Sequence, residues 1–458
     1  MAEVSHKKRV WGWMIFDWAS QPYNTLLLTF IFGPYFAQTV SDMFINNGME
    51  IEAAKAHTQG IWANMLTIAG LAIAITAPIF GAMADSSGRR LPWIWFFSIL
   101  YVLGSFLLWW AYADGSNYMF TLLVFGIGFL GMEFATIFTN AMLPDLGNDK
   151  QVGKISGSGF AMGYWGGVIA LFIMFLLVVD DANTGKTLIG IDPLFGLLDA
   201  STREGTRMVG PFTAVWYILS MVFFFAWVSE TPRRTGGFSV GKTFADLGRT
   251  IASLPKRSSL FAYLGSSLFY RDALNGVFTF GGIYAVFVLN WQLTLVGIFG
   301  ILSAISAAFF SWVGGFADRR FGPKPVIVFC VLVLIGVCVM ILNMTPTHIF
   351  GIKLAFGSQL PTQIFFVCGA VIGAAGGALQ ASSRTMMVRH SNPERPTEAF
   401  GLYALSGKST AFLAPALIAF ATQMTGSARL GVSPLVVLFL ISLVLLLWVK
   451  PNGDVAKA

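Results

Sequence analysis

Long apolar stretches separated by short polar ones dominate the pattern of this 458-residue chain. A helix needs about 20 mainly apolar residues to cross a bilayer. Twelve stretches meet this length, and they span 11–40, 59–84, 91–113, 116–142, 156–179, 210–229, 259–289, 291–316, 325–345, 360–388, 398–423 and 432–449. We therefore predict an all-α membrane protein with twelve transmembrane helices, numbered here in chain order.

Composition supports a lipid environment. Hydrophobic residues make up 56% of the chain and charged residues 11%, against roughly a quarter charged in soluble proteins. The mean hydropathy is +0.71. These values exclude a cytosolic enzyme, a disordered chain and a secreted disulfide scaffold. The cysteines lie inside apolar stretches without metal-ligand spacing, so we expect no cofactor and no metal site. The partner that the composition demands is the lipid bilayer.

Basic residues are distributed unequally between the two sets of loops. Twenty of the 29 lysines and arginines fall in the termini and the loops on one side, and six fall in the loops on the other. Positively charged loops face the cytoplasm, so we expect both termini to be cytoplasmic, in a bacterial inner (plasma) membrane. The net charge of +7 comes from short clusters at the ends of apolar stretches, and we expect no nucleic-acid binding.

The chain divides near its middle. Gly81-x-x-x-Asp85 with Gly88-Arg89-Arg90 after the second helix recurs as Gly314-x-x-x-Asp318 with Arg319-Arg320 after the eighth helix. A second repeated pattern pairs Pro144-Asp145 before Gly153 with Pro393-Glu394 before Gly401. Duplicated halves are frequent in transporters. The predicted organisation is a cytoplasmic N-terminus at 1–10, six-helix bundles at 11–230 and 259–450, a cytoplasmic linker at 231–258 and a cytoplasmic tail at 451–458.

The linker contains a match to a nucleotide-binding pattern. Residues 236–243 fit the P-loop spacing G-x-x-x-x-G-K-T, with Lys242 as its lysine. A working P-loop joins a buried strand to a helix inside a βαβ unit, and the linker is too short for such a domain. We therefore expect no nucleotide binding.

The repeated loop resembles the signature of the major facilitator superfamily, in which it joins helices 2 and 3. This resemblance implies two six-helix bundles and a cytoplasmic gate. In such a gate, glycine allows close helix contact and the aspartate meets basic residues and a neighbouring helix end. The gate residues that it implies are Gly81, Asp85, Gly88, Arg89, Arg90, Gly314, Asp318, Arg319 and Arg320.

Further segments resemble the branch of that superfamily containing the autophagy-related vacuolar amino-acid effluxers and their bacterial relatives. They are Phe16-Asp17-Trp18-Ala19, Gly163-Tyr164-Trp165-Gly166-Gly167, Tyr270-Arg271-Asp272, Gln380-Ala381-Ser382-Ser383-Arg384 and residues 400–408. Gly163, Tyr164, Gly166 and Gly167 form the implied helix-packing motif. Ser20, Pro22, Arg271 and Ala273 depart from the pattern of the branch. These departures fall on helices 1 and 7, which the resemblance implies to be cavity helices.

Six ionisable residues lie inside apolar stretches, where charges are costly and mark functional sites. They are Asp17, Glu133, Arg271, Asp272, Arg384 and Lys408. The resemblance implies that helices 1, 4, 7 and 10 line the central cavity, and five of the six lie on them. Simpler alternatives remain open: Asp17 as an interfacial residue, Glu133 and Arg384 as a structural salt bridge, and Lys408 as a structural ion pair.

Together these features predict a monomeric secondary transporter, not an enzyme. It would move a small polar or zwitterionic solute, such as an amino acid, by alternating access. Protons would couple through Asp272 first, with Glu133 or Asp17 next, because a buried carboxyl can bind a proton near neutral pH. Alternatives are another solute class (peptide, sugar, organic anion or drug) and a non-transporting sensor. A polytopic membrane enzyme would depend on Asp180-Asp181, which lack a partner motif.

Overall fold

A computed structural model describes residues 4–181, 184–230, 252–289, 293–408, 413–427 and 429–454, together with single positions 241, 245, 248, 249 and 291. The linker residues 236–240 and 242–243 and the side chain of Lys408 lie outside this description.

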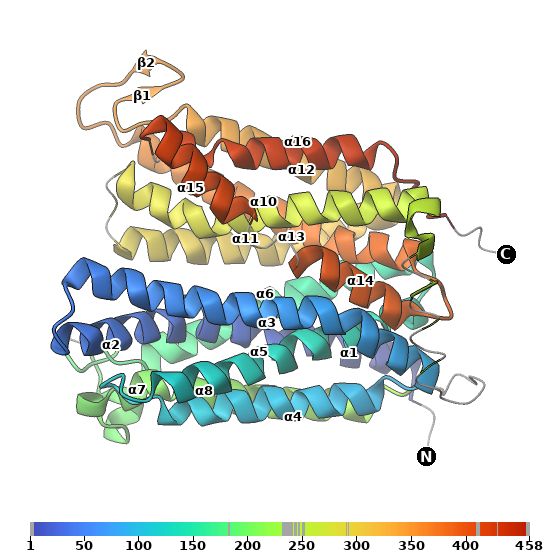
Figure 1. Cartoon of the computed structure of the whole chain (residues 1–458), viewed down its shortest axis with the longest axis horizontal. Helices are drawn as coiled ribbons and strands as arrows, with labels where there is room; N and C mark the ends of the chain where they lie inside the picture. The colour runs from blue at the N-terminus through green and yellow to red at the C-terminus, as the bar shows by residue number, and fades with distance from the viewer. Residues whose placement is uncertain are drawn as a thin grey trace. The chain divides into compact units, whose positions relative to one another are not determined.

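The described chain is mostly helical (Figure 1). Its α-helices are α1 (His6–Pro22), α2 (Phe32–Asn46), α3 (Ile51–Ser87), α4 (Leu91–Leu107), α5 (Tyr118–Asn140), α6 (Asp149–Leu177), α7 (Glu204–Arg207), α8 (Val209–Trp227), α10 (Ser258–Phe287), α11 (Leu293–Phe321), α12 (Pro323–Leu342), α13 (Leu360–His390), α14 (Pro396–Lys408), α15 (Leu413–Thr425) and α16 (Pro434–Leu446). A π-helix, η1 (Tyr23–Phe30), separates α1 from α2. Strands β1 (His348–Ile349) and β2 (Ile352–Lys353) form an antiparallel hairpin.

Eight helices of the described chain are long and apolar enough to span a membrane. They are Ala53–Ser87, Leu91–Trp110, Tyr118–Asn140, Asp149–Leu177, Glu204–Trp227, Leu295–Phe321, Pro323–Leu342 and Leu360–His390. The predicted count of twelve is therefore not confirmed, although the mostly helical membrane architecture is. The first predicted span is interrupted by η1. The eleventh contains residues of α14 and α15, and residues 409–412 between them lie outside the description.

The chain forms two compact units. Unit 1 contains residues 1–73, 89–139 and 162–233, and unit 2 contains residues 74–88, 140–161 and 234–458. The C-terminal part of α3 and the N-terminal part of α6 thus belong to unit 2, together with α10 to α16. The predicted bundles at 11–230 and 259–450 stay a prediction.

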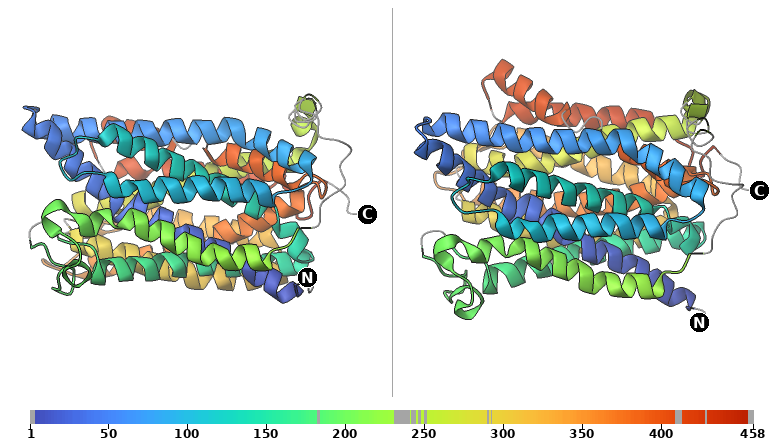
Figure 2. Two further views of the ribbon diagram at one scale, coloured as in Figure 1. Left: turned by 90° about the horizontal axis from the view of Figure 1, so that it is seen from below. Right: turned by 60° about the horizontal axis from the view of Figure 1, so that its bottom comes forward.

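Aromatic packing holds unit 1 together. Helix α8 packs against α1 and α4, and the three run side by side in Figure 2. Tyr101 and Tyr217 stack with ring centroids 3.9 Å apart, and the Tyr23 hydroxyl donates to the Phe125 carbonyl at 2.7 Å. This last bond joins the π-helix to α5 and fixes the position of Tyr23 relative to that helix.

Small residues hold unit 2 together. Helix α13 packs against α11 and α12, and α10 packs against α16, as Figure 1 shows. A Cβ atom added to Gly377 of α13 would lie 2.7 Å from the Ala307 carbonyl oxygen of α11. Small residues allow helices in a membrane to approach closely where water supplies no hydrophobic driving force.

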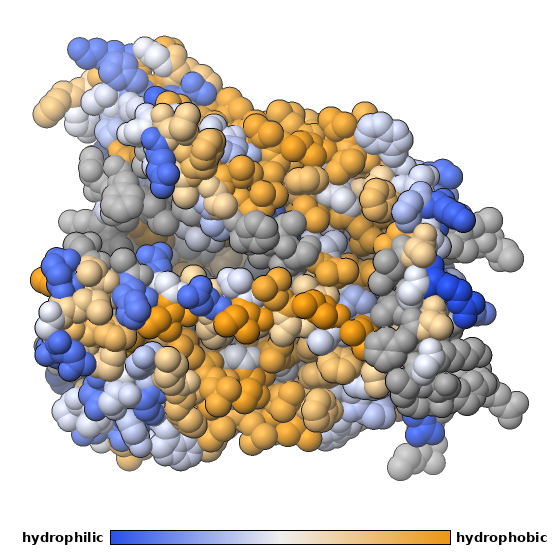
Figure 3. All heavy atoms as spheres, in the orientation of Figure 1, coloured by the Kyte–Doolittle hydropathy of each residue, from blue (hydrophilic) through white to orange (hydrophobic). Residues whose placement is uncertain are grey.

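Apolar side chains cover the outer surface of the helices. Figure 3 shows hydrophobic residues over the middle of α4, α10 and α16 and hydrophilic residues gathered toward the helix ends. Large hydrophobic residues such as Ile68, Leu123, Leu219 and Phe329 are exposed. Apolar surface of this extent is characteristic of an integral membrane protein, in which lipid covers it.

Candidate functional site

A glycine with positive φ follows each copy of the repeated motif, three residues after Asp85 and four residues after Asp318. Gly88 follows α3 with φ of +69°, and Gly322 follows α11 with φ of +84°. Their amides donate to the carbonyls of Asp85 at 3.2 Å and Asp318 at 2.8 Å. A left-handed residue at a helix end favours glycine because it has no Cβ. Positive φ explains why a glycine follows the helix in each copy.

The two motif aspartates are buried but bind different partners within unit 2. Asp85 accepts hydrogen bonds from the backbone amides of Thr397 at 3.2 Å and Glu398 at 2.8 Å. These amides open α14, so the carboxylate caps the positive end of that helix. Asp318 accepts a bond from the Ser382 hydroxyl of α13 at 2.8 Å.

Glycines bring the chain into backbone contact beside both aspartates. Added Cβ atoms on Gly81 and Gly401 would lie 2.6 Å from the carbonyl oxygens of Thr397 and Ala77, so α3 and α14 touch. An added Cβ on Gly157 would lie 2.5 Å from the Ser311 carbonyl oxygen, so α6 and α11 touch. We call these contacts the α3/α14 and α6/α11 crossings. Gly153 and Gly401 belong to the second repeated sequence pattern. Gly153 lies at the α6/α11 crossing, and Gly401 lies at the α3/α14 crossing.

The motif arginines have separate surroundings. Arg90 is buried in unit 1, and Arg89, Arg319 and Arg320 are exposed. Glu230 accepts bonds from the backbone amides of Arg90 at 2.7 Å and Leu91 at 3.0 Å, and thus caps α4. The sequence interpretation missed Glu230. Its signal was an acid immediately after an apolar stretch, a pattern shared by many interfacial residues.

Arg384 of α13 is 2% exposed. Its Nε donates to the Ser156 hydroxyl at 3.0 Å, and its terminal nitrogens donate to the Ser156 carbonyl at 2.7 Å and the Asn140 Oδ1 at 3.0 Å. The guanidinium carbon lies 4.2 Å from the centroid of the Phe160 ring. This arginine therefore ties α13 to the end of α5 and the start of α6 within unit 2.

Arg271 of α10 contacts α14, and Asp272 of α10 contacts α15. The Arg271 guanidinium donates to the Tyr403 carbonyl at 3.0 Å and lies 4.3 Å from the Tyr403 ring centroid, on α14. Asp272 Oδ2 accepts the Ala414 amide of α15 at 2.8 Å. Among the residues that the structure describes, no donor bonds to Asp272 Oδ1.

Two further candidate charges, Asp17 and Glu133, lie in unit 1, whereas Lys408 belongs to unit 2 and its side chain lies outside the description. Asp17 on α1 and Glu133 on α5 are both half-buried. Gly163, Gly166 and Gly167 of α6 lie against the segment from Asp17 to Thr25, while Tyr164 is half-buried. The glycine motif thus places α6 directly on the part of α1 that carries Asp17.

The π-helix is a second feature that the sequence interpretation missed. It begins directly after Pro22, whose ring nitrogen cannot donate to a preceding carbonyl. The Thr29 hydroxyl bonds the Asn24 carbonyl at 2.8 Å, five residues back. Such π segments are frequent at functional sites, and Pro22 was the available signal.

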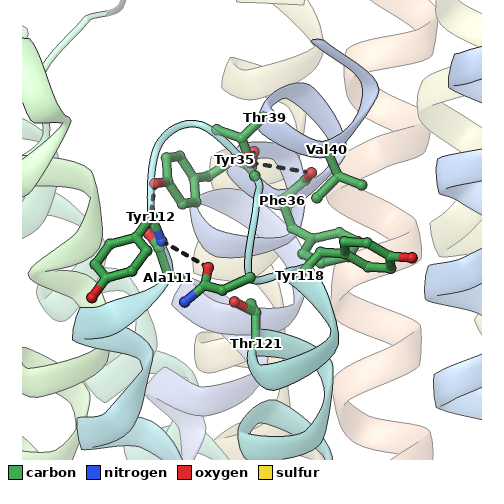
Figure 4. A pocket seen from close by; sticks show the side chains of 10 residues that line it. Tyr35, Phe36, Thr39, Val40, Ala111, Tyr112, Tyr118 and Thr121 are labelled. Carbon is green, nitrogen blue, oxygen red and sulfur yellow. Dashed lines mark hydrogen bonds between the residues drawn. The ribbon is translucent and has the colours of Figure 1, made fainter. Parts of the chain in front are cut away.

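Figure 4 shows a small cavity in unit 1. Its volume is about 10 Å³, and it lies between Tyr35, Thr39, Tyr112 and Tyr118. This volume suits about one water molecule. A transported solute therefore needs a different site.

No group of three or more His, Cys, Asp or Glu in the described part of the chain could hold a metal ion. His390 is fully buried, and its Nε2 lies 2.7 Å from the Ser259 hydroxyl. That hydroxyl accepts the Lys450 amide at 2.7 Å, so this polar group joins the chain after α16 to α10 and α13.

The fold is that of the major facilitator superfamily of transporters. The human organic anion transporter MFSD10 superposes with a TM-score of 0.68 at 14% identity, over 97% of this chain and 100% of its own. The E. coli fucose:proton symporter FucP superposes with a TM-score of 0.68 at 14% identity, over 96% and 97%. The proton:xylose symporter XylE gives a TM-score of 0.70 at 11% identity, over 97% and 95%.

Within this superfamily, the chain belongs to the family described as vacuole effluxer Atg22 like, whose model matches residues 5–453. An uncharacterized MFS-type transporter of Bacillus subtilis, YxiO, is 23% identical over 97% of this chain and 96% of its own. Autophagy-related protein 22-1 of Aspergillus niger is 23% identical over 65% of this chain and 47% of its own. The chain thus spans about half the length of that fungal relative. The family is one of transporters, which are not an enzyme class.

Proposed function

We propose that this protein is a secondary transporter that moves a small polar or zwitterionic solute, an amino acid or a similar compound, by alternating access. The observation that carries the proposal is the pair of crossings beside Asp85 and Asp318. Each joins a helix of the predicted first bundle to one of the predicted second bundle. If the bundles rock, these contacts must separate and re-form. They therefore have the properties of a gate, with both termini on the cytoplasmic side of a plasma membrane.

The proposed coupling residue is Asp272. Asp272 is 3% exposed, and its Oδ2 accepts the Ala414 amide of α15. A proton on Oδ1 would leave that hydrogen bond in place while removing the charge. The neutral and charged forms then differ in how strongly they hold α15, which gives proton binding a mechanical consequence. Asp17 and Glu133 are the alternative sites.

The direct experiment is uptake by proteoliposomes under an inward proton gradient. The solute is first found by thermal shift against amino acids, peptides, sugars and organic acids, since a ligand that binds only the folded state stabilises it. We expect gradient-driven accumulation of an amino-acid-like compound. Binding without transport in either direction would instead favour a non-transporting sensor. A sugar or an organic anion as the only stabilising class would overturn the proposed substrate.

Asp272→Asn tests the coupling. The amide keeps the size of the side chain and an oxygen acceptor for Ala414, but it cannot titrate. We expect loss of accumulation with retention of solute exchange between the two faces of the membrane. Glu133→Gln is the matched variant. If accumulation survives Asp272→Asn and fails in Glu133→Gln, the coupling site is on α5.

A further inference from the structure

The segment between α6 and α7 exposes large apolar side chains. We call residues 180–203 the α6–α7 loop; all of it except 182 and 183 is described, and Figure 2 shows it in green at the ends of α6 and α8. Leu188, Ile189, Phe195 and Leu197 are 76%, 55%, 75% and 77% exposed. Side chains of this kind are normally buried, so their common exposure in one loop requires an explanation.

Several charged and polar groups of the loop have partners within the loop or directly beside it. Asp180 is fully buried; it pairs with Arg203 at 2.6 Å and accepts the amide and hydroxyl of Thr206 at 2.9 and 3.1 Å. Lys186 pairs with Asp192 at 3.0 Å. The loop is therefore a folded structure with its own polar framework, and the apolar residues are left on its outside.

The backbone keeps these residues outside. Leu194 and Phe195 have φ of +46° and +60°, a conformation that is uncommon for residues with large side chains. The Thr187 amide donates to the Ile191 carbonyl at 2.8 Å and closes the turn that carries Leu188 and Ile189. The exposed positions thus belong to two defined turns.

A backbone hydrogen bond fixes the depth of the first turn. The Leu188 amide donates to the Phe175 carbonyl at 3.1 Å, and Phe175 lies in the last turn of the membrane-spanning helix Asp149–Leu177. On the same helix Trp165, Ile169 and Phe172 are exposed. Their spacing places them on one face, so an apolar stripe leads along α6 toward Leu188.

We propose that the α6–α7 loop inserts Leu188, Ile189, Phe195 and Leu197 into the boundary between headgroups and acyl chains of the leaflet at which α6 ends. The occupant is phospholipid, because the exposed residues continue the exposed apolar stripe of a spanning helix at the level where that helix ends. Apolar side chains at this boundary bind lipid through the area they remove from water. The loop would thereby fix the depth of the α6 and α8 ends.

Depth-dependent fluorescence quenching tests this inference. Leu188→Cys and Phe195→Cys are labelled with an environment-sensitive fluorophore in phosphatidylcholine nanodiscs containing spin-labelled lipids. Cys330, Cys338 and Cys368 are buried, so background labelling is small. Ser116→Cys, in the exposed polar turn between α4 and α5, is the control. All three variants must retain the thermal stability of the parent protein before they are compared.

We expect blue-shifted emission at positions 188 and 195, with stronger quenching by a spin label near the headgroup than by one near the chain end, and neither effect at position 116. Water-like emission without lipid quenching at both loop positions, in folded protein, would overturn the inference. Blue-shifted emission that appears only when another membrane protein is present, and not in nanodiscs of lipid alone, would also overturn the inference. The occupant would then be a protein.

Discussion

The buried guanidinium of Arg384 donates hydrogen bonds from three nitrogens and lies against the ring of Phe160. Lysine keeps the charge but has a single nitrogen, so it cannot reach Ser156 and Asn140 together or lie flat on Phe160. We expect Arg384→Lys to lower the free energy of unfolding by about 2 kcal/mol, the typical loss for hydrogen bonds to a charged group. Thermal unfolding in detergent measures this, with the exposed Arg320→Lys as the control.

The same residue allows two functional explanations. In one, the guanidinium grips a substrate carboxylate; in the other, it neutralises Glu133, and losing either partner leaves a costly buried charge. The double variant Glu133→Gln/Arg384→Gln separates them through substrate affinity. Restored affinity would mean a structural pair. Continued loss of binding in a stable protein would support Arg384 as a ligand.

Asp85 gives a prediction about a single helix cap. Asp85→Ala removes the acceptor for the first amides of α14, and lost caps typically cost about 1 kcal/mol. We expect a lower unfolding temperature and faster labelling of a cysteine placed at Thr397, whereas the exposed neighbour Glu394→Gln should change neither. Unchanged labelling would show that the α3/α14 crossing does not depend on this carboxylate.

Among the helices, the crossings depend on glycine. A Cβ on Gly401 would lie 2.6 Å from a backbone oxygen, closer than real contacts allow, whereas nothing lies within 4 Å of a Cβ on Gly336 of α12. Overpacking typically costs about 1–3 kcal/mol, and glycine to alanine in an open helix gains up to about 1 kcal/mol. We expect Gly401→Ala to lower the unfolding temperature and Gly336→Ala to keep or raise it.

Sequence patterns predicted some of these elements because the patterns are local. Apolar length identified most spans. The repeat was expected after the second and eighth helices, whereas Asp85 and Asp318 lie inside α3 and α11, near the C-terminal ends of these helices. The partners of Arg384 could not be predicted, since Ser156 and Asn140 are more than two hundred residues away and serine and asparagine carry no distinctive spacing. The π-helix after Pro22 was hidden inside a continuous apolar stretch.

At the scale of the whole molecule, alternating access requires the crossings to open. In the α6/α11 crossing, the Lys154 ammonium lies 5.2 Å from the centroid of the Phe316 ring. Under the proposed mechanism these residues belong to different bundles and must separate in each transport cycle. A short reducible thiol crosslinker between Lys154→Cys and Phe316→Cys would hold the gate in one state.

We therefore expect crosslinking of this pair to stop uptake into proteoliposomes and a reductant to restore it. The control pair is Arg389→Cys/Pro451→Cys, because the Arg389 guanidinium donates to the Pro451 carbonyl at 3.1 Å and both residues lie beyond position 258, where no relative movement is expected. Each single cysteine variant, treated alike, measures the effect of labelling alone. Full uptake through a completely crosslinked Lys154→Cys/Phe316→Cys protein would contradict rocking at this crossing. Equal inhibition by the control pair would trace the loss to general rigidity, and the α6/α11 contact would then have no special part in gating.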